Sequence, residues 1–151
     1  MASSLVKIDI HLVFHVKSTG VAMQKNDLPR IFQYIGGIIR GLNAIPIEIG
    51  GMPDHIHILT SLPKSMALTD FVRDIKANSS KWIKQIDPVY AHFAWQDGYG
   101  AFSVSPSLLE KTVNYIRTQG EHHNRRTFRD EYELFLKHYN IEYDERYAFS
   151  D

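Results

Sequence analysis

The period of the apolar residues changes repeatedly along this chain, and the order of those periods limits its fold more than any other feature of the sequence. Alternation at every second position is typical of a strand buried on one face, and spacings of three and four residues are typical of an amphipathic helix. The predicted strands are Leu5–Lys17, Ile45–Gly51, Asp54–Leu62 and Gly98–Pro106, with a hairpin turn at Met52 and Pro53. The predicted helices are Leu28–Leu42, a helix capped by Thr69 that ends before Pro88, a helix capped by Ser107 that runs to about His123, and Phe128–His138.

The resulting order is βαββαβ followed by a helix, with one hairpin and two connections long enough to contain a helix. This is the order of a ferredoxin-like split βαβ sandwich, an α+β fold with a four-stranded antiparallel sheet and helices on one face. The other face is expected to be open. The chain has 151 residues, of which 44% are hydrophobic, so we expect one domain over residues 1–151, with C-terminal helices in residues 127–151.

The sequence contains no cysteine, which excludes disulfides and thiolate chemistry. The opening MASSLVKIDIHLVF has no basic leader and reaches its apolar residues by alternation, so it predicts a strand and not a signal peptide. No apolar run approaches membrane-spanning length. We therefore expect a soluble cytoplasmic protein with no membrane partner.

The charges balance overall, with 17 basic and 17 acidic side chains, but they are distributed unevenly. Residues 64–84 and residues 107–129 each carry five basic and two acidic groups, whereas residues 130–151 carry two basic and seven acidic groups. A net charge of zero argues against a nucleic-acid partner only if the charges are mixed. The two basic segments permit a basic surface, provided that the acidic tail packs elsewhere.

Two histidines stand one residue apart in the stretch GMPDHIHIL. On a strand, His55 and His57 point to the same face, roughly 7 Å apart, while Ile56 and Ile58 point to the other. Two neutral imidazoles at this spacing can bind one divalent metal ion between them. The alternative is a pair of ordinary surface histidines, and because His11 and His15 have a related arrangement on the first strand, spacing alone does not decide.

The predicted helix after Ser107 could complete such a site. Tyr115 and Gln119 are four residues apart, so they share a face beside the apolar stripe. A tyrosine beside a metal ion can act as a nucleophile, and a glutamine amide oxygen can act as a further ligand. Taken alone, this pair is more often structural. His122 and His123, at the end of the predicted helix, are either further site residues or C-terminal caps.

Six segments in order make the chain similar to a known family over nearly its whole length. They are IHLVFHVK, GGMPDHIHIL, FVRDIKANSSKWI, FAWQDGYGAFSVS, VNYIRTQGEHH and FRDEYELFLKHYNIEYDERY. Together they resemble the single-tyrosine HUH transposases of small insertion sequences, including the relatives associated with repetitive extragenic palindromes. The sequence departs from many members in being less basic overall, and in the stretch VKSTGVAMQK, where family members often have a basic residue soon after the first strand.

The resemblance implies the activity and the site residues. His55 and His57 match the metal-binding pair, Tyr115 matches the nucleophile, and Gln119 matches the helix-borne metal ligand. The implied reaction is cleavage and rejoining of single-stranded DNA with hairpins, using Mg²⁺ or Mn²⁺, through a covalent 5′-phosphotyrosine link. It also implies a homodimer in which the tyrosine helix of one subunit can complete the histidine site of the other.

The predicted second helix and the segment after it supply candidate DNA contacts. Basic side chains at near-helical intervals can follow a phosphate backbone, and aromatic residues can stack on bases. The candidates are Arg73, Lys76, Lys81, Lys84 and Trp95. A solvated helix face and a core tryptophan explain the same residues equally well.

Two other functions are compatible with the sequence. One is a non-catalytic ferredoxin-like module that binds single-stranded nucleic acid on its open sheet. The other is a zinc hydrolase, for which no third histidine or carboxylate stands at an evident ligand spacing, although Asp54 and His11 are candidates. The combination of two histidines, Tyr115 and Gln119 favours the transposase, since a binding module needs none of them.

Overall fold

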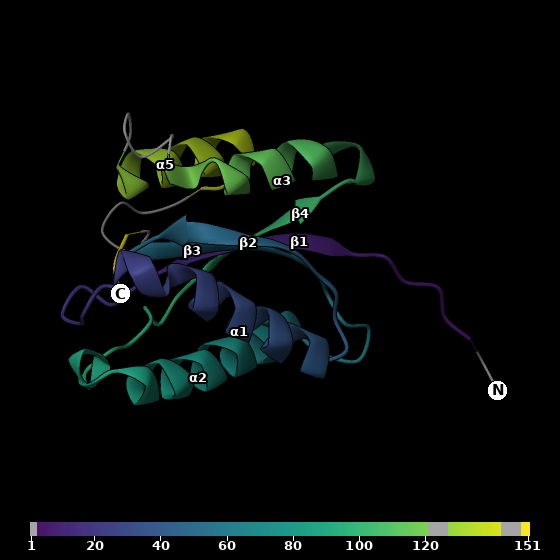
Figure 1. Ribbon diagram of the computed structural model, residues 1–151. Helices are drawn as coiled ribbons and strands as arrows, with labels where there is room; N and C mark the ends of the chain where they lie inside the picture. Colours follow the sequence, from purple (N-terminus) through teal and green to yellow (C-terminus); the bar gives the residue numbers. More distant parts are fainter. Residues whose placement is uncertain (1–2, 121–126, 143–148) are drawn as a thin grey trace.

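The computed structural model describes residues 3–120, 127–142 and 149–151 and has an α+β fold with three layers. A central sheet is covered by α1 (Leu28–Gly41) and α2 (Leu68–Ile86) on one face and by α3 (Leu109–Arg117) and α5 (Phe128–His138) on the other (Figure 1). In the described residues, no helix is both long and apolar enough to cross a membrane.

The sheet has four antiparallel strands in the order β2-β3-β1-β4, as predicted for a ferredoxin-like fold. The strands are β1 (Asp9–His15), β2 (Pro46–Met52), β3 (His55–Ser61) and β4 (Gly100–Val104). β2 and β3 form the predicted hairpin. At its end Gly51 has φ 154°, a conformation that favours glycine, and a Cβ there would lie 2.3 Å from the His55 carbonyl oxygen.

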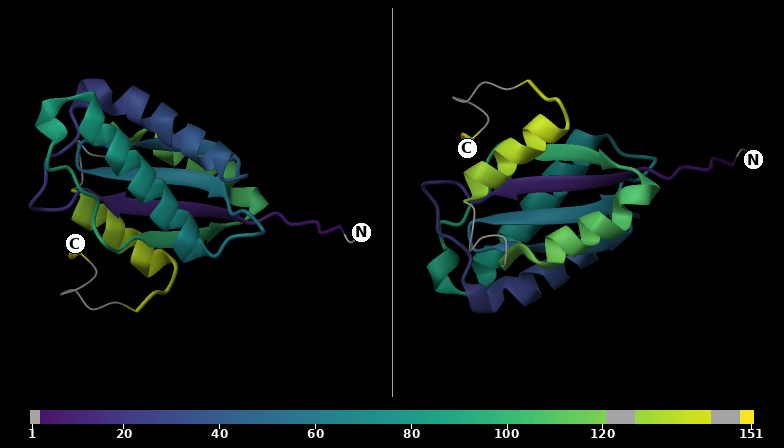
Figure 2. Two further views of the ribbon diagram at one scale, coloured as in Figure 1. Left: turned by 90° about the horizontal axis from the view of Figure 1, so that it is seen from below. Right: turned by 90° about the horizontal axis from the view of Figure 1, so that it is seen from above.

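The two faces of the central strands carry different side chains. Even-numbered residues of β1 and β3, such as Leu12, Phe14 and Ile58, are fully buried in the large core beneath α1 and α2. Odd-numbered residues point to the layer of α3 and α5, and they include His11, His55 and His57. The predicted alternation of β3 is therefore confirmed, and Figure 2 shows the two helix pairs on opposite sides of the sheet.

The expectation that one sheet face is open is wrong. α3 and α5 cover it, so the side chains of His55 and His57 are fully buried. Each helix contributes an apolar stripe: Ile116 of α3 joins Leu59 and Val104, and the stripe of α5 joins Val13 and Phe102. The C-terminal helix is thus the second cover of the sheet.

Three predicted boundaries are also wrong, each for a local reason. The first strand does not begin at Leu5, because its two neighbours pair with it only from Asp9 onward. Ser107 does not cap the next helix, because Pro106 begins a 3-10 turn, Pro106–Leu108, that precedes α3. α3 ends at Arg117, so Gln119 lies beyond it, and His122 and His123 lie outside the described residues. The other two short 3-10 helices are Lys25–Asp27 and Pro88–Tyr90.

A glycine in β2 allows α3 to lie close to the sheet. A Cβ on Gly50 would lie 2.7 Å from the carbonyl oxygen of Ile116 and 2.8 Å from its Cγ2 atom. Since Ile116 is 1% exposed and follows Tyr115 directly, this contact fixes the height of the tyrosine above the sheet. Gly100 in β4 likewise allows α5 to lie close to the sheet. A Cβ on Gly100 would lie 2.6 Å from the hydroxyl oxygen of Tyr132 in α5.

Replacing Gly50 with alanine should therefore lower the free energy of unfolding by about 1–3 kcal/mol, because the added methyl group pushes α3 away from β2. Urea denaturation followed by circular dichroism measures this. Gly37→Ala is the matched control: Gly37 lies in α1 with no neighbouring atom within 4 Å of a Cβ, so stability should stay equal or rise by up to about 1 kcal/mol. Equal stability of the two variants would contradict the close-approach argument.

Candidate active site

Buried polar side chains meet under α3 and α5, on the sheet face that carries the histidines. His11, His55 and His57 are at most 1% exposed. β1 and β3 bring them together, because His57 lies opposite Val13 in the register and so stands diagonally beside His11. His15, on the same face at the end of β1, is half-buried, and its Nδ1 lies 2.7 Å from the Val16 carbonyl oxygen.

His57 is held on both sides of its ring. Its Nδ1 lies 2.8 Å from His11 Nε2, and its Nε2 lies 2.8 Å from Glu131 Oε1. The Glu131 carboxylate comes from α5, which packs on β1 and β4 through Val13 and Phe102. These two contacts fix the plane of the imidazole and turn Nε2 toward the space between the sheet and the helices.

His55 is held in a similar way by different partners. Its Nδ1 lies 2.8 Å from Asp54 Oδ1, and its Nε2 lies 3.1 Å from Gln119 Oε1. The ring of Phe128 stacks on it with 4.5 Å between centroids. The Nε2 atoms of both histidines therefore point toward the same group of side chains, from α5 and from the residues just after α3.

Tyr115 reaches this group from α3. Its hydroxyl group donates a hydrogen bond to Glu131 Oε1, the same oxygen that contacts His57. The Gln119 amide nitrogen donates to that oxygen over 3.2 Å. The ring of Tyr115 lies edge-on to that of His57, with 5.7 Å between centroids. One carboxylate thus joins the tyrosine, the glutamine and a histidine of the same chain.

Glu131 is ionised at neutral pH despite being 3% exposed. Burial opposes ionisation, but the hydrogen bond and charge of His57, together with the hydrogen bond from Tyr115, outweigh it and lower the pKa of Glu131 to about 2. A carboxylate with this pKa is a poor proton acceptor for a phenol. Its chemistry is that of a fixed negative charge that orients the hydroxyl group and attracts cations.

His11 favours the neutral form of its imidazole ring. Burial, followed by the charge of His57, lowers its pKa well below the ordinary value of 6.5. A neutral His11 can accept a hydrogen bond at Nε2 from the N–H at His57 Nδ1. His57 Nε2 would then bind a metal ion in place of the proton that it shares with Glu131 Oε1.

The donor atoms present suit a divalent metal ion. In the described residues, one ligand atom each from His55, His57 and Glu131 lie within 4.8 Å of one another. The Gln119 amide oxygen, 3.1 Å from His55 Nε2, is a fourth donor beside them. Two imidazoles with carboxylate and amide oxygens suit Mn²⁺ or Zn²⁺ better than they suit Ca²⁺, which prefers oxygen ligands alone.

All four residues predicted for the site from sequence, namely His55, His57, Tyr115 and Gln119, lie in this cluster. Their chemical roles stay predictions. Sequence analysis missed Glu131, which lies in α5 far along the chain. A signal was present: Phe128, Tyr132 and Phe135 form an apolar stripe at helical spacing, and Glu131 falls on the same side. A charged residue within a buried stripe needs a partner.

The predicted DNA-contact residues lie elsewhere, on or near α2 across the sheet from the cluster. Arg73, Lys81 and Lys84 are exposed. Lys76 is half-buried, and its ammonium group donates to three backbone carbonyls at 2.6–3.2 Å, while burial lowers its pKa to about 8. Trp95 is 5% exposed and donates to Ser79 Oγ. These two side chains therefore already have structural roles.

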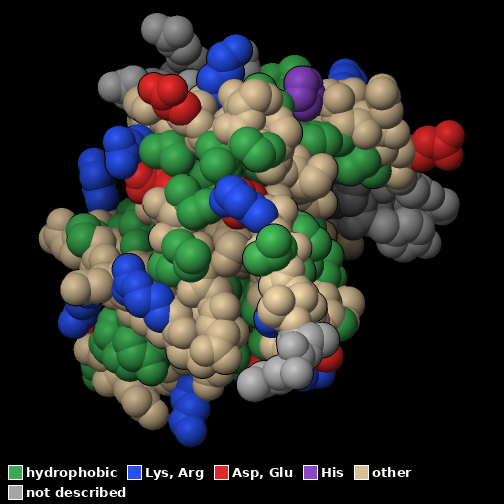
Figure 3. All heavy atoms as spheres, turned by 90° about the vertical axis from the view of Figure 1, so that its right-hand side faces the viewer, with side chains coloured by type: hydrophobic (Ala, Val, Ile, Leu, Met, Phe, Trp, Pro, Cys, Tyr) green, Lys and Arg blue, Asp and Glu red, His purple; other side chains and the backbone are tan. Residues whose placement is uncertain are grey.

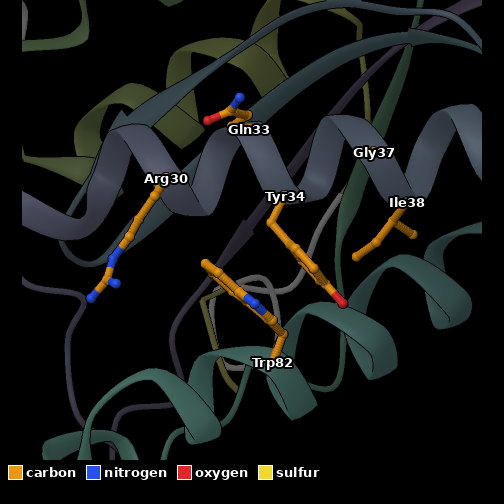
Figure 4. A pocket seen from close by; sticks show the side chains of 6 residues that line it. All are labelled: Arg30, Gln33, Tyr34, Gly37, Ile38 and Trp82. Atoms are coloured by element: carbon orange, nitrogen blue, oxygen red, sulfur yellow. The ribbon is translucent and has the colours of Figure 1, made fainter.

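A shallow hollow on this far side lies between α1 and α2 (Figure 4). Tyr34 and Trp82 stack across it, with 4.2 Å between their ring centroids and 7° between their planes. The side chain of Arg30 at its edge is bound to Asp27 at 2.7 Å. The residues that line this hollow include the hydroxyl group of Tyr34 but no histidine or carboxylate, so they offer no cluster of metal ligands.

Comparisons with known proteins find similarity to transposases. A family of sequences described as transposase, IS200-like, matches residues 4–119. The ISDra2 transposase TnpA of Deinococcus radiodurans is 30% identical over 84 residues, which cover 52% of this chain and 59% of the relative. The match therefore spans less than two thirds of that curated relative.

Two solved structures are similar in fold. One is a crystal structure described as a transposase of Deinococcus radiodurans R1, with a TM-score of 0.61, 18% identity, and coverage of 79% of this chain and 95% of the other. The second is a REP-associated tyrosine transposase bound to a REP hairpin, with a TM-score of 0.59, 13% identity, and coverage of 82% and 73%. At these identities the likeness concerns the fold.

Glu131→Gln should reduce the affinity for Mn²⁺ at least ten-fold, because the amide keeps the shape of the side chain but removes the negative charge. Titration calorimetry at pH 7 measures this. Glu133→Gln is the matched control, since Glu133 lies in the same helix and pairs with Arg129 away from the cluster, at 3.9 Å. Unchanged affinity in Glu131→Gln would remove Glu131 from the set of metal ligands.

Proposed function

The chain belongs to the family of IS200-like transposases, and from this we propose that it cleaves and rejoins single-stranded DNA through a covalent 5′-phosphotyrosine intermediate on Tyr115. One observation carries the proposal. The hydroxyl group of Tyr115 donates a hydrogen bond to the same Glu131 oxygen that contacts His57. The proposed nucleophile and the candidate metal ligands therefore form one cluster. A module that only binds nucleic acid has no need of this arrangement.

In the proposed cleavage step, the Tyr115 oxygen attacks a backbone phosphorus atom. The new bond joins the tyrosine oxygen to phosphorus, and the bond from phosphorus to the 3′ oxygen breaks. The phenol loses one proton and the departing 3′ oxygen gains one, so the step is balanced. Another 3′-OH then attacks the tyrosyl phosphate and releases the enzyme, and because the phosphodiester energy is retained, no ATP is consumed.

The side chains around Tyr115 would have different roles in this step. Glu131 accepts the hydrogen bond of the phenol and so aims its oxygen at the space beside the histidines. His55, His57 and Glu131, with Gln119, would hold the Mg²⁺ or Mn²⁺ ion, and His11 would keep His57 in the binding tautomer. A bound ion would supply positive charge to a phosphate oxygen and favour attack.

The DNA partner is proposed to carry hairpins at the element ends. One support is that a fold neighbour, the REP-associated tyrosine transposase, has a REP hairpin bound. Arg73, Lys81 and Lys84 are exposed on α2, where they could contact duplex phosphates remote from the cleaved bond. For Lys76 and Trp95, a DNA contact would require release from their present partners.

A second candidate function comes from Glu131. A pair of histidines with a glutamate is also the ligand set of catalytic zinc sites in hydrolases. Such an enzyme would activate water and would form no covalent link to its substrate. It would also have no use for a tyrosine hydroxyl held at the metal ligands, which is why the transposase is preferred.

Tyr115→Phe should abolish the covalent protein–DNA adduct, because it removes the attacking oxygen and leaves the ring in place. The assay uses Mn²⁺ and labelled single strands with hairpins, read on denaturing gels. Tyr34→Phe is the matched control: this exposed tyrosine stacks on Trp82 on the other side of the sheet, so the variant should keep the wild-type yield. An adduct at the wild-type level in Tyr115→Phe would make the nucleophile assignment wrong, and DNA binding without any adduct in wild type would indicate a binding module.

Mixing two inactive variants tests how the site is assembled in the proposed homodimer. Tyr115 meets Glu131 and His57 of its own chain, so we expect a site formed in cis. A mixture of Tyr115→Phe and His57→Ala subunits should then show no more adduct than either variant alone. Recovery of adduct in the mixture would show that the tyrosine helix reaches the partner's histidines.

A further inference from the structure

A cleft between α3 and α5 leads to the tyrosine. It has a volume of about 780 Å³, within the range of about 300–1,000 Å³ that small-molecule sites occupy. His11, Tyr115 and Glu131 line it, so it is continuous with the buried cluster. Any group that enters this cleft from the surface approaches the Tyr115 hydroxyl oxygen.

The walls of the cleft are apolar and partly aromatic. Leu108 and Leu134 stand on opposite sides and are 40% and 46% exposed. Phe135 and Tyr139 form the aromatic part, and both rings stack on Phe102 of the sheet, with 5.7 and 4.7 Å between centroids. Rings held in this way offer flat surfaces at low entropic cost.

Two lysines stand among these walls. Lys111 of α3, together with Lys137 and His138 of α5, lines the cleft, and neither lysine makes an ion pair within the described part of the chain. Among the described lining residues the only carboxylate is Glu131, whose charge is already directed to His57 and Tyr115. The upper part of Figure 3, where this layer lies, shows hydrophobic side chains exposed beside basic ones.

We propose that this cleft binds the single-stranded nucleotides that flank the scissile phosphate. The bases lie against Phe135, Tyr139 and the two leucines, while Lys111 and Lys137 contact phosphates on either side. Aromatic surfaces combined with unpaired cations are the chemistry by which proteins hold single strands without reading their sequence. The inference rests on the proposed function, because it names the part of the substrate that the nucleophile meets.

The first test measures binding without cleavage, in a Tyr115→Phe background. The probe is a fluorescein-labelled pool of ten-nucleotide single strands of randomised sequence, followed by anisotropy. Lys111→Ala with Lys137→Ala should weaken binding about ten-fold at low salt and reduce the slope of log K against log salt by about 1.4. Lys25→Ala with Lys64→Ala, two exposed lysines outside the cleft, should change binding little. Equal effects of the two pairs would overturn the proposal.

The second test locates the bases. Strands containing 5-iodo-deoxyuridine are irradiated on the protein, and the linked peptides are identified by mass spectrometry. Crosslinks to Phe135 or Tyr139 are expected, and Tyr139→Ala should remove part of them and weaken binding about ten-fold. Crosslinks confined to α1 and α2 would overturn the proposal.

The two proposals fail in different ways. If wild type forms the Tyr115 adduct while the lysine pair and the crosslinks give negative results, the cleft assignment is wrong and the transposase chemistry stands. If the cleft variants lose single-strand binding but wild type forms no adduct in Mn²⁺, the cleft is a single-strand site and the cleavage chemistry is wrong.

Discussion

The buried carboxylate of Glu131 is the interaction on which the arrangement of the site depends. It joins α5 to β3 through His57 and to α3 through Tyr115, so one side chain sets the positions of three elements. A buried charge is costly unless it is paired and hydrogen-bonded, and here histidine, tyrosine and glutamine all contribute. The same contacts that compensate for burial place the Tyr115 hydroxyl group beside the candidate metal ligands. The contacts of Glu131 with His57, Tyr115 and Gln119 therefore both stabilise the fold and arrange the candidate site.

The alternation of side chains along the strands places the core residues on one face of the sheet and the histidines on the other. Even positions of β1 and β3 supply the main core with α1 and α2, and odd positions supply the histidines. Register shifts by one residue would exchange the two faces, so the large core protects the orientation of His55 and His57. The layer of α3 and α5, which holds the histidine cluster, therefore packs on a sheet that α1 and α2 already stabilise from the other side.

The sequence predicted much of this because the relevant patterns are local. Period 2 and period 3.6 within short windows predict the order of strands and helices along the chain and the β2–β3 hairpin. They also predict that His55 and His57 share one face of their strand. Glu131 was not predicted, because it meets His57 through tertiary packing over 74 positions of the chain and has no fixed spacing to it. The covering of the second sheet face was not predicted for a related reason. The sequence of Phe128–His138 predicts an apolar stripe but does not indicate which surface that stripe packs against. The helix start after Ser107 was misjudged because Pro106 favours a 3-10 turn before α3.

The three layers differ greatly in how much apolar surface holds them. Among the described residues, the core beneath α1 and α2 contains nineteen buried hydrophobic side chains, whereas the two clusters beneath α3 and α5 contain three and four. Free energies of local opening follow such differences, so the thin layer can separate from the sheet at a fraction of the cost of global unfolding. Amide hydrogens of α3 and α5 would then exchange with solvent well before those of α1 and the central strands. A protein built in this way can widen the cleft between α3 and α5 and expose the buried histidines while most of its fold stays intact.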